Sequence, residues 1–157
     1  MKEIAKKANR CTFILHRAKK FSFSIRSLVT LFLWFMRTGL EYAAPVWHPG
    51  LTQQQHQRLE RIQKRCCRII LGAEYVSYAD ALQRLNLSTL FDRREMLTLR
   101  FGRSLLRSPH HRGLLPPTLG QLHGRRTRNS HKLRNVRCRT ERYRQSTVPY
   151  IVRLLNR

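Results

Sequence analysis

Hydrophobic residues recur at helical spacing in the first forty positions of the chain. Over residues 2–20, apolar side chains return every three or four positions and basic side chains fall on the opposite face, which predicts an amphipathic helix. A second helix is predicted from about Ile25 to Arg37, and it is apolar almost all round, so other elements are expected to cover it. Its apolar run spans about ten positions, whereas a membrane span needs about 20. We therefore expect a buried helix here and no membrane segment.

The stretch from Leu40 to Leu51 breaks this pattern. Two prolines cannot sit inside a continuing helix, so the chain is expected to turn here. The aromatic and apolar residues of the stretch are expected to enter the core, and Trp47 and His48 to fill a corner of it rather than to meet a ligand. The core residues predicted in this stretch are Leu40, Tyr42 and Trp47.

A long amphipathic helix is predicted from Thr52 to Leu71. Thr52 and Gln55 have the spacing of a capping box, and Gly72 stands where a C-terminal glycine cap belongs. The apolar face contains the predicted core residues Leu59, Ile62 and Ile69, together with Cys66 and Ile70. The opposite, basic face consists of Arg58, Arg61, Lys64, Arg65 and Arg68.

Shorter helices are predicted downstream. One begins at Ser77, and another spans Leu87–Ser108 with Ser88 as its expected cap. From His110 onward the pattern fails, because prolines, glycines and a basic run leave too little apolar surface to bury. Residues 148–155 predict a last short helix. The predicted fold is all-α, a small bundle of four or five helices with a basic, partly disordered C-terminal third. Its expected parts are a helical bundle at 1–108, a basic low-structure linker at 109–147 and a short C-terminal helix at 148–157.

Charge changes this picture more than any other property. The 157 residues include 32 Lys and Arg against 8 Asp and Glu, a formal net charge of +24. Such an excess repels itself in a compact monomer and attracts polyanions, so nucleic acid is the expected partner class and an anionic membrane surface the competing one. We expect an RNA or DNA duplex as the partner, with neither a membrane nor a small-molecule substrate.

The expected nucleic-acid-binding residues lie on the basic helix face and in the C-terminal tail. A charge run on a helix also fits an ordinary solvated face, although such a face normally mixes both signs. The tail is typical of a phosphate-binding or nuclear-localisation segment, with a degenerate linker as the alternative. The predicted set is Arg58, Arg61, Lys64, Arg65, Arg68, Arg125, Arg126, Arg128, Arg137 and Arg139.

The acids are scattered, and they predict no catalytic residue. The stretch Tyr78–Ala81 is one residue short of the Tyr-Ala-Asp-Asp box in which paired carboxylates hold two Mg²⁺ ions. We interpret Asp80 as a residue of a helix N-terminus instead. Glu41 lies among apolar neighbours, where an unpaired carboxylate is costly, so we predict an ion pair with Arg65 or Arg68.

The cysteines predict reduced thiols. They have neither the regular spacing of a disulfide framework nor a secretion signal before them, which favours a nuclear or cytoplasmic protein that is not secreted. Together with His110 and His111 they lack the spacing of a zinc finger, so we expect no metal site and no cofactor in this chain. The four are Cys11, Cys66, Cys67 and Cys138.

Similarity to a known family extends over six stretches: residues 40–51 (LEYAAPVWHPGL), 59–65 (LERIQKR), 68–72 (RIILG), 114–117 (LLPP), 132–134 (KLR) and 137–143 (RCRTERY). Together, and in this order, they resemble the segment downstream of the polymerase palm in the reverse transcriptases of non-LTR (LINE-type) retrotransposons. The resemblance covers most of the chain and is more specific than any single motif.

The resemblance implies a parent RNA-directed DNA polymerase that uses Mg²⁺, usually with an endonuclease in the same polyprotein. This chain would correspond to the thumb and the connecting region, a helical bundle that grips the template–primer duplex, and its partner would be the missing palm domain. The family's catalytic aspartates lie upstream, so none is carried over, and Met1 is expected to be an accidental start inside a longer reading frame. The chain would then be a non-catalytic nucleic-acid-binding fragment. The alternatives are a structural remnant without function and a basic ribosome- or chromatin-associated protein.

Overall fold

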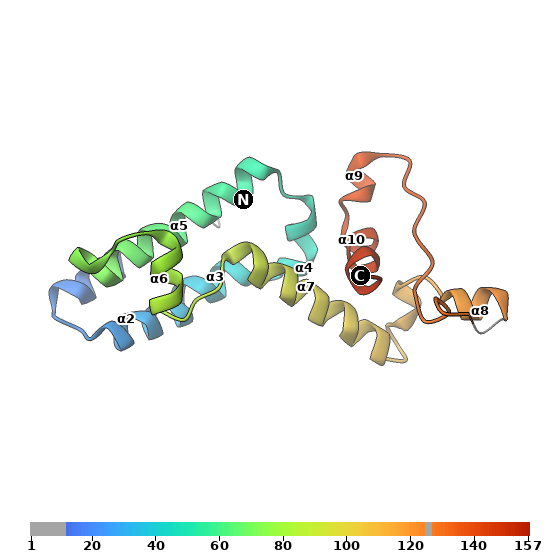
Figure 1. The fold of residues 1–157 in the computed structure, drawn as a ribbon, viewed down its shortest axis with the longest axis horizontal. Helices are drawn as coiled ribbons and strands as arrows, with labels where there is room; N and C mark the ends of the chain where they lie inside the picture. The colour runs from blue at the N-terminus through green and yellow to red at the C-terminus, as the bar shows by residue number, and fades with distance from the viewer. Residues whose placement is uncertain (1–11, 125–126) are drawn as a thin grey trace. The chain divides into compact units, whose positions relative to one another are not determined.

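The computed structural model describes residues 12–124 and 127–157, and these residues are mostly helical, with no β-strand among them (Figure 1). The expected all-α class is confirmed, but the helices are shorter and more numerous than the four or five predicted. Residues 12–20 are helical, and the further elements are α2 (Ile25–Leu31), the π-helix η1 (Phe32–Arg37), α3 (Thr38–Glu41), α4 (Ala44–Trp47), the 3₁₀ turn η2 (His48–Gly50), α5 (Gln53–Leu71), η3 (Gly72–Glu74), α6 (Tyr78–Arg84), α7 (Leu90–Arg107), η4 (Arg112–Leu114), α8 (Leu119–His123), α9 (Glu141–Arg144) and α10 (Thr147–Leu155).

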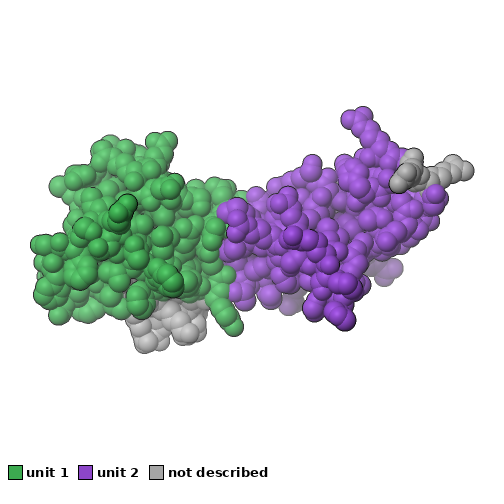
Figure 2. Space-filling view, turned by 90° about the horizontal axis from the view of Figure 1, so that it is seen from below, with its two compact units in different colours: residues 1–42, 52–93 green, residues 43–51, 94–157 purple. Residues whose placement is uncertain are grey.

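The chain forms two compact units, which Figure 2 shows in different colours. Unit 1 comprises Met1–Tyr42 and Thr52–Arg93, and unit 2 comprises Ala43–Leu51 and Arg94–Arg157. The boundaries expected after residues 108 and 147 both fall inside unit 2. No helix in the described part of the chain combines the length and the apolar character needed to cross a membrane.

The core of unit 1 lies between α5 and the helical run α2–η1–α3. The run buries one residue per turn, and these residues pack against the buried apolar stripe of α5. The prediction ended this helix at Arg37, but it continues to Glu41 through a π-helical segment. The buried residues are Leu28, Phe32, Met36 and Leu40 from the run, and Leu59, Ile62, Cys66 and Ile70 from α5.

Two expectations about the core of the first half are wrong. Tyr42 is 80% exposed rather than buried, because Ala43 adopts a left-handed conformation (φ 51°) and turns the chain immediately after α3. Trp34 and Phe35 are 72% and 60% exposed, so the apolar helix is not covered on all sides. Trp47 and Ile69 are half-buried. In residues 2–20, the predicted positions before residue 12 lie outside the described residues, and the later ones, Leu15 and Ala18, are buried as expected.

Side-chain caps fix the ends of the helices. The capping box of α5 is confirmed, because the Gln55 N–H donates to Thr52 Oγ1 (3.3 Å) and the Thr52 N–H donates to Gln55 Oε1 (2.9 Å). Helix α7 begins at Leu90, two residues after the predicted cap Ser88. Thr89 is the cap instead, because its Oγ1 accepts a hydrogen bond from the Asp92 N–H at 3.1 Å. The Ser88 carbonyl oxygen, for its part, accepts a hydrogen bond from the Gln63 amide at 2.8 Å, so Ser88 serves a tertiary contact instead.

Glu41 pairs with different arginines from those predicted. Its carboxylate accepts hydrogen bonds from Arg37 Nε at 2.7 Å and from Arg93 Nε at 3.1 Å, so it joins α3 to the first turn of α7 within unit 1. Arg65 and Arg68 lie on the exposed face of α5, whereas Glu41 lies at the edge of the buried stripe of α3. The prediction failed because ion-pair partners were sought on the next helix in sequence.

Unit 2 has its own apolar core, built around α10. The predicted C-terminal helix is confirmed, and α10 packs on α4 and η2. The side chain of Asn156, just after α10, accepts the Leu133 N–H and donates to the Leu133 carbonyl oxygen, both at 2.9 Å. Residues 109–147, expected to have little structure, thus contain η4, α8, α9 and an antiparallel bridge between Thr118 and Leu133. The buried core residues are Leu105, Leu115, Leu133, Ile151 and Val152.

Candidate nucleic-acid interface

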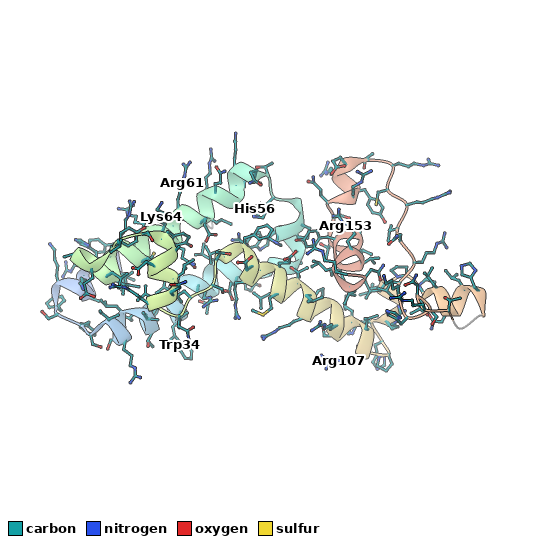
Figure 3. The ribbon with its side chains drawn as sticks, in the orientation of Figure 1. Trp34, His56, Arg61, Lys64, Arg107 and Arg153 are labelled. Carbon is teal, nitrogen blue, oxygen red and sulfur yellow. The ribbon has the colours of Figure 1, made fainter. Side chains whose placement is uncertain are left out.

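Helix α5 presents a row of arginines along one face. Arg58, Arg61, Arg65 and Arg68 are all exposed, and Lys64 is half-buried beside them. Their spacing of three and four residues keeps the row on one side of the helix, and its ends are about 15 Å apart along the axis. Figure 3 shows Arg61 projecting away from α2 and α3. We call these five residues the α5 basic face.

The α5 basic face has no acidic counter-charge in the part of the chain that the structure describes. None of the ion pairs formed there includes one of its five residues. The acid on α5 is Glu60, and it points inward, where it accepts hydrogen bonds from the Tyr78 hydroxyl and from the Leu90 N–H. The positive field of this face is therefore not neutralised by its own helix.

The inner side of α5 is held by polar contacts as well as by apolar packing. The Gln63 side chain is 1% exposed, and its amide nitrogen donates to the Tyr78 hydroxyl oxygen (3.0 Å) and to the Ser88 carbonyl oxygen (2.8 Å). Burial, and then the hydrogen bond to Glu60, raise the pKa of Tyr78, so the phenol stays protonated at neutral pH. These contacts tie α5 to α6 and to the start of α7, which orients the basic face.

Sequence reasoning missed Glu60 and Gln63 as structural residues. A signal was present, because Gln63 falls within the apolar stripe of α5, between Ile62 and Cys66, where a polar side chain must find a partner. The hydrogen-bond partners of Glu60 and Gln63 lie up to 30 positions away in the sequence, as Leu90 does from Glu60. No local sequence pattern identifies such partners.

The far end of the α5 basic face carries an aromatic contact. The Arg68 guanidinium lies over the Tyr75 ring, with its central carbon 5.3 Å from the ring centroid. A cation over an aromatic face keeps its charge while losing some freedom of movement. Arg68 is therefore more constrained than the other exposed arginines of the row.

The other predicted binding residues belong to unit 2. Arg128, Arg137 and Arg139 are exposed there, while Arg125 and Arg126 lie outside the described residues. The structure thus brings half of the predicted set together on one helix face in unit 1. Of the remainder, Arg137 and Arg139 line one hollow in unit 2.

Asp80 has the structural role expected for it. Its backbone N–H donates to Ser77 Oγ at 3.2 Å in the first turn of α6, and its carboxylate pairs with Arg84 at 3.1 Å. In residues 12–124 and 127–157, no three His, Cys, Asp or Glu side chains lie close enough together to hold a metal ion.

Comparisons of the chain with protein-family models, with curated proteins and with solved structures find no match.

Proposed function

We propose that this chain binds nucleic-acid duplexes without sequence preference through the α5 basic face, and that it does so without catalysis. The observation that supports this most is the row of four exposed arginines on one capped helix, with no acid paired to it among the described residues. Arginines spaced along a straight helix contact successive phosphates of a backbone, and the release of counterions supplies affinity that does not depend on base sequence.

The resemblance to non-LTR reverse transcriptases gives this proposal its context. In that reading the chain is the thumb and connecting region, the ligand is the template–primer duplex, and the Mg²⁺-binding carboxylates belong to the missing palm domain. The exposed Trp34 and Phe35 on η1 agree with a polypeptide partner, because a soluble domain rarely leaves neighbouring large aromatic side chains in water without a use for them. We assign the palm contact to this side of unit 1.

The test is the salt dependence of duplex binding. Four phosphate contacts predict a slope of about −3.6 for log K against log salt, or about 150-fold weaker binding between 50 and 200 mM salt. The affinity of the full chain for a labelled RNA–DNA duplex is measured by fluorescence anisotropy across this range. In the variant Arg58→Glu/Arg61→Glu/Arg65→Glu the slope should fall by about 2.7, since three contacts are lost.

The matched control is Arg100→Glu/Arg103→Glu/Arg107→Glu on α7. These arginines are exposed as well, and the change in net charge is the same. If both variants lose the same slope, binding is a diffuse response to net charge and the α5 basic face is not the site. A wild-type chain with no measurable duplex binding would overturn the proposal altogether. Circular dichroism melts of each variant confirm that the fold is retained.

A further inference from the structure

The loop at residues 135–144 in unit 2, which ends in the short helix α9, is bordered by two hollows that the proposed duplex site does not use. The smaller hollow, about 250 Å³, is lined by the apolar residues Val136, Pro149 and Val152 and by two arginines, Arg144 and Arg153. The larger hollow, about 590 Å³, is lined by Arg137, Arg139, Thr140 and Tyr143. Cys138 borders both of them.

Hydrogen bonds to α10 and to the residue after it hold this loop in place. The Asn156 amide nitrogen donates to the Leu133 carbonyl oxygen at 2.9 Å and to Asn135 Oδ1 at 3.3 Å, at the start of the loop. Arg153 Nη2 donates to the Arg144 carbonyl oxygen at 3.1 Å, at the end of the loop. The walls of the hollows are therefore formed before any ligand arrives.

The chemistry of the hollows fits a flat ring joined to an anion. Tyr143 is 46% exposed, and the exposed Arg137 and Arg139 line the same hollow. No acid lines either hollow among the residues described; the nearest in sequence, Glu141, is paired with Arg144 at 3.2 Å. Aromatic side chains stack on bases, and arginines bind phosphates.

The shape favours single strands over duplexes. Drug-sized ligands occupy sites of about 300–1,000 Å³, so the larger hollow has room for about one nucleotide. In a duplex the bases are stacked and paired, and their faces cannot reach a tyrosine at the edge of a hollow. An unstacked strand exposes those faces, which is how proteins usually recognise single-stranded RNA.

We propose that the loop at 135–144 is a binding site for single-stranded nucleic acid, in which Tyr143 stacks on a base and Arg137 and Arg139 neutralise the adjacent phosphates. The inference rests on the proposed function only in that the chain binds nucleic acid. It adds a second site, with a different strand preference, in a different unit.

The experiment measures binding and footprint with the full chain. A short single-stranded RNA without internal pairing is titrated by anisotropy, and an RNA–DNA duplex is titrated in parallel. Tyr143→Ala should weaken single-strand binding by roughly tenfold, whereas Tyr143→Phe, which keeps the ring, should leave it near wild type. Arg137→Glu/Arg139→Glu should lower the salt slope for the single strand, and Arg100→Glu/Arg103→Glu provides the charge-matched control.

Alkylation of Cys138 reports the position of the ligand. This thiol is half-buried at the rim of both hollows, so a bound strand should slow its modification, as measured by mass mapping of each cysteine. The site is supported if the single strand slows alkylation of Cys138 and if Tyr143→Ala weakens single-strand binding. Equal protection by poly-glutamate, or single-strand binding that responds only to Arg58→Glu/Arg61→Glu, overturns it. In that second case duplex binding through the α5 basic face still stands.

Discussion

The substitution Glu41→Gln tests the tertiary contact that joins α3 to α7. The carboxylate is 13% exposed and receives hydrogen bonds from Arg37 and Arg93, whose side chains are 15% and 27% exposed. Glutamine keeps the shape but removes the charge, which leaves two partly buried guanidinium groups close together without a counter-ion. This is the arrangement in which removing one partner costs more than the ion pair itself contributes.

The expected cost lies between two limits. Exposed ion pairs contribute about 0–1 kcal/mol, and breaking a fully buried pair costs about 3–5 kcal/mol. A site buried to this degree, with two hydrogen-bonded arginines, should lose about 2 kcal/mol. For a chain of this length that corresponds to a fall in melting temperature of about 4–8 °C.

Chemical denaturation followed by circular dichroism gives the free energy of unfolding. Glu141→Gln is the matched control, because Glu141 and Arg144 form an ion pair with side chains 63% and 56% exposed, and its loss should cost less than about 0.5 kcal/mol. A double-mutant cycle of Glu41→Gln with Arg93→Met should show coupling of about 1 kcal/mol or more, whereas a cycle with Arg65→Met should show additivity. A Glu41→Gln variant as stable as wild type, or coupling to Arg65 instead, would refute this account of the contact.

Three further predictions test packing, capping and ionisation. Gly102→Val should cost about 1–3 kcal/mol of unfolding free energy, because a Cβ there would lie 2.6 Å from Ile151 Cγ2. The control Gly39→Val should cost less, because no atom lies within 4 Å of the Cβ position there. Equal losses of stability in the two variants would contradict this packing. Thr52→Ala should cost about 1 kcal/mol in the same assay, and Thr52→Ser should restore most of it. Burial raises the pKa of the Cys67 thiol to about 11, so the free energy of unfolding should fall as pH rises from 9 toward 11. Cys67→Ala should reduce this fall in stability. A pH profile of stability that Cys67→Ala leaves unchanged would argue against the buried thiol as its cause.

Local patterns in the sequence predicted the elements that depend on nearby residues. The capping box at Thr52 and the stop at Gly72 are contacts within one helix, so spacing alone identifies them. The opposition of buried Leu59 and exposed Arg58 on α5 follows from helical geometry in the same way. The basic face could therefore be assigned before any coordinates.

Tertiary contacts could not be predicted in this way. Tyr42 looked like a core residue by composition, and a turn was expected in this stretch, but the left-handed conformation falls on Ala43, a residue type that does not signal it. The order in residues 109–147 depends on Asn156, which lies more than twenty positions beyond Leu133. Leu115 and Leu133 of this segment also enter the apolar core of unit 2, which is completed by Ile151 and Val152 of α10.

The distribution of acids explains why the α5 basic face remains positive. Each acid in the described residues is engaged inside its own unit: Glu41, Glu74, Asp80, Glu95 and Glu141 in ion pairs, Glu60 with Tyr78 and Leu90, and Asp92 with Thr89. None of the ion pairs that these acids form includes an arginine of α5. The chain has few carboxylates and a net charge of +24. Substituting the carboxylates should therefore mainly lower the free energy of unfolding, and substituting the exposed arginines should mainly weaken the proposed binding. This separation supports the proposal that the α5 basic face binds a polyanion, because an ordinary solvated helix surface normally mixes both signs.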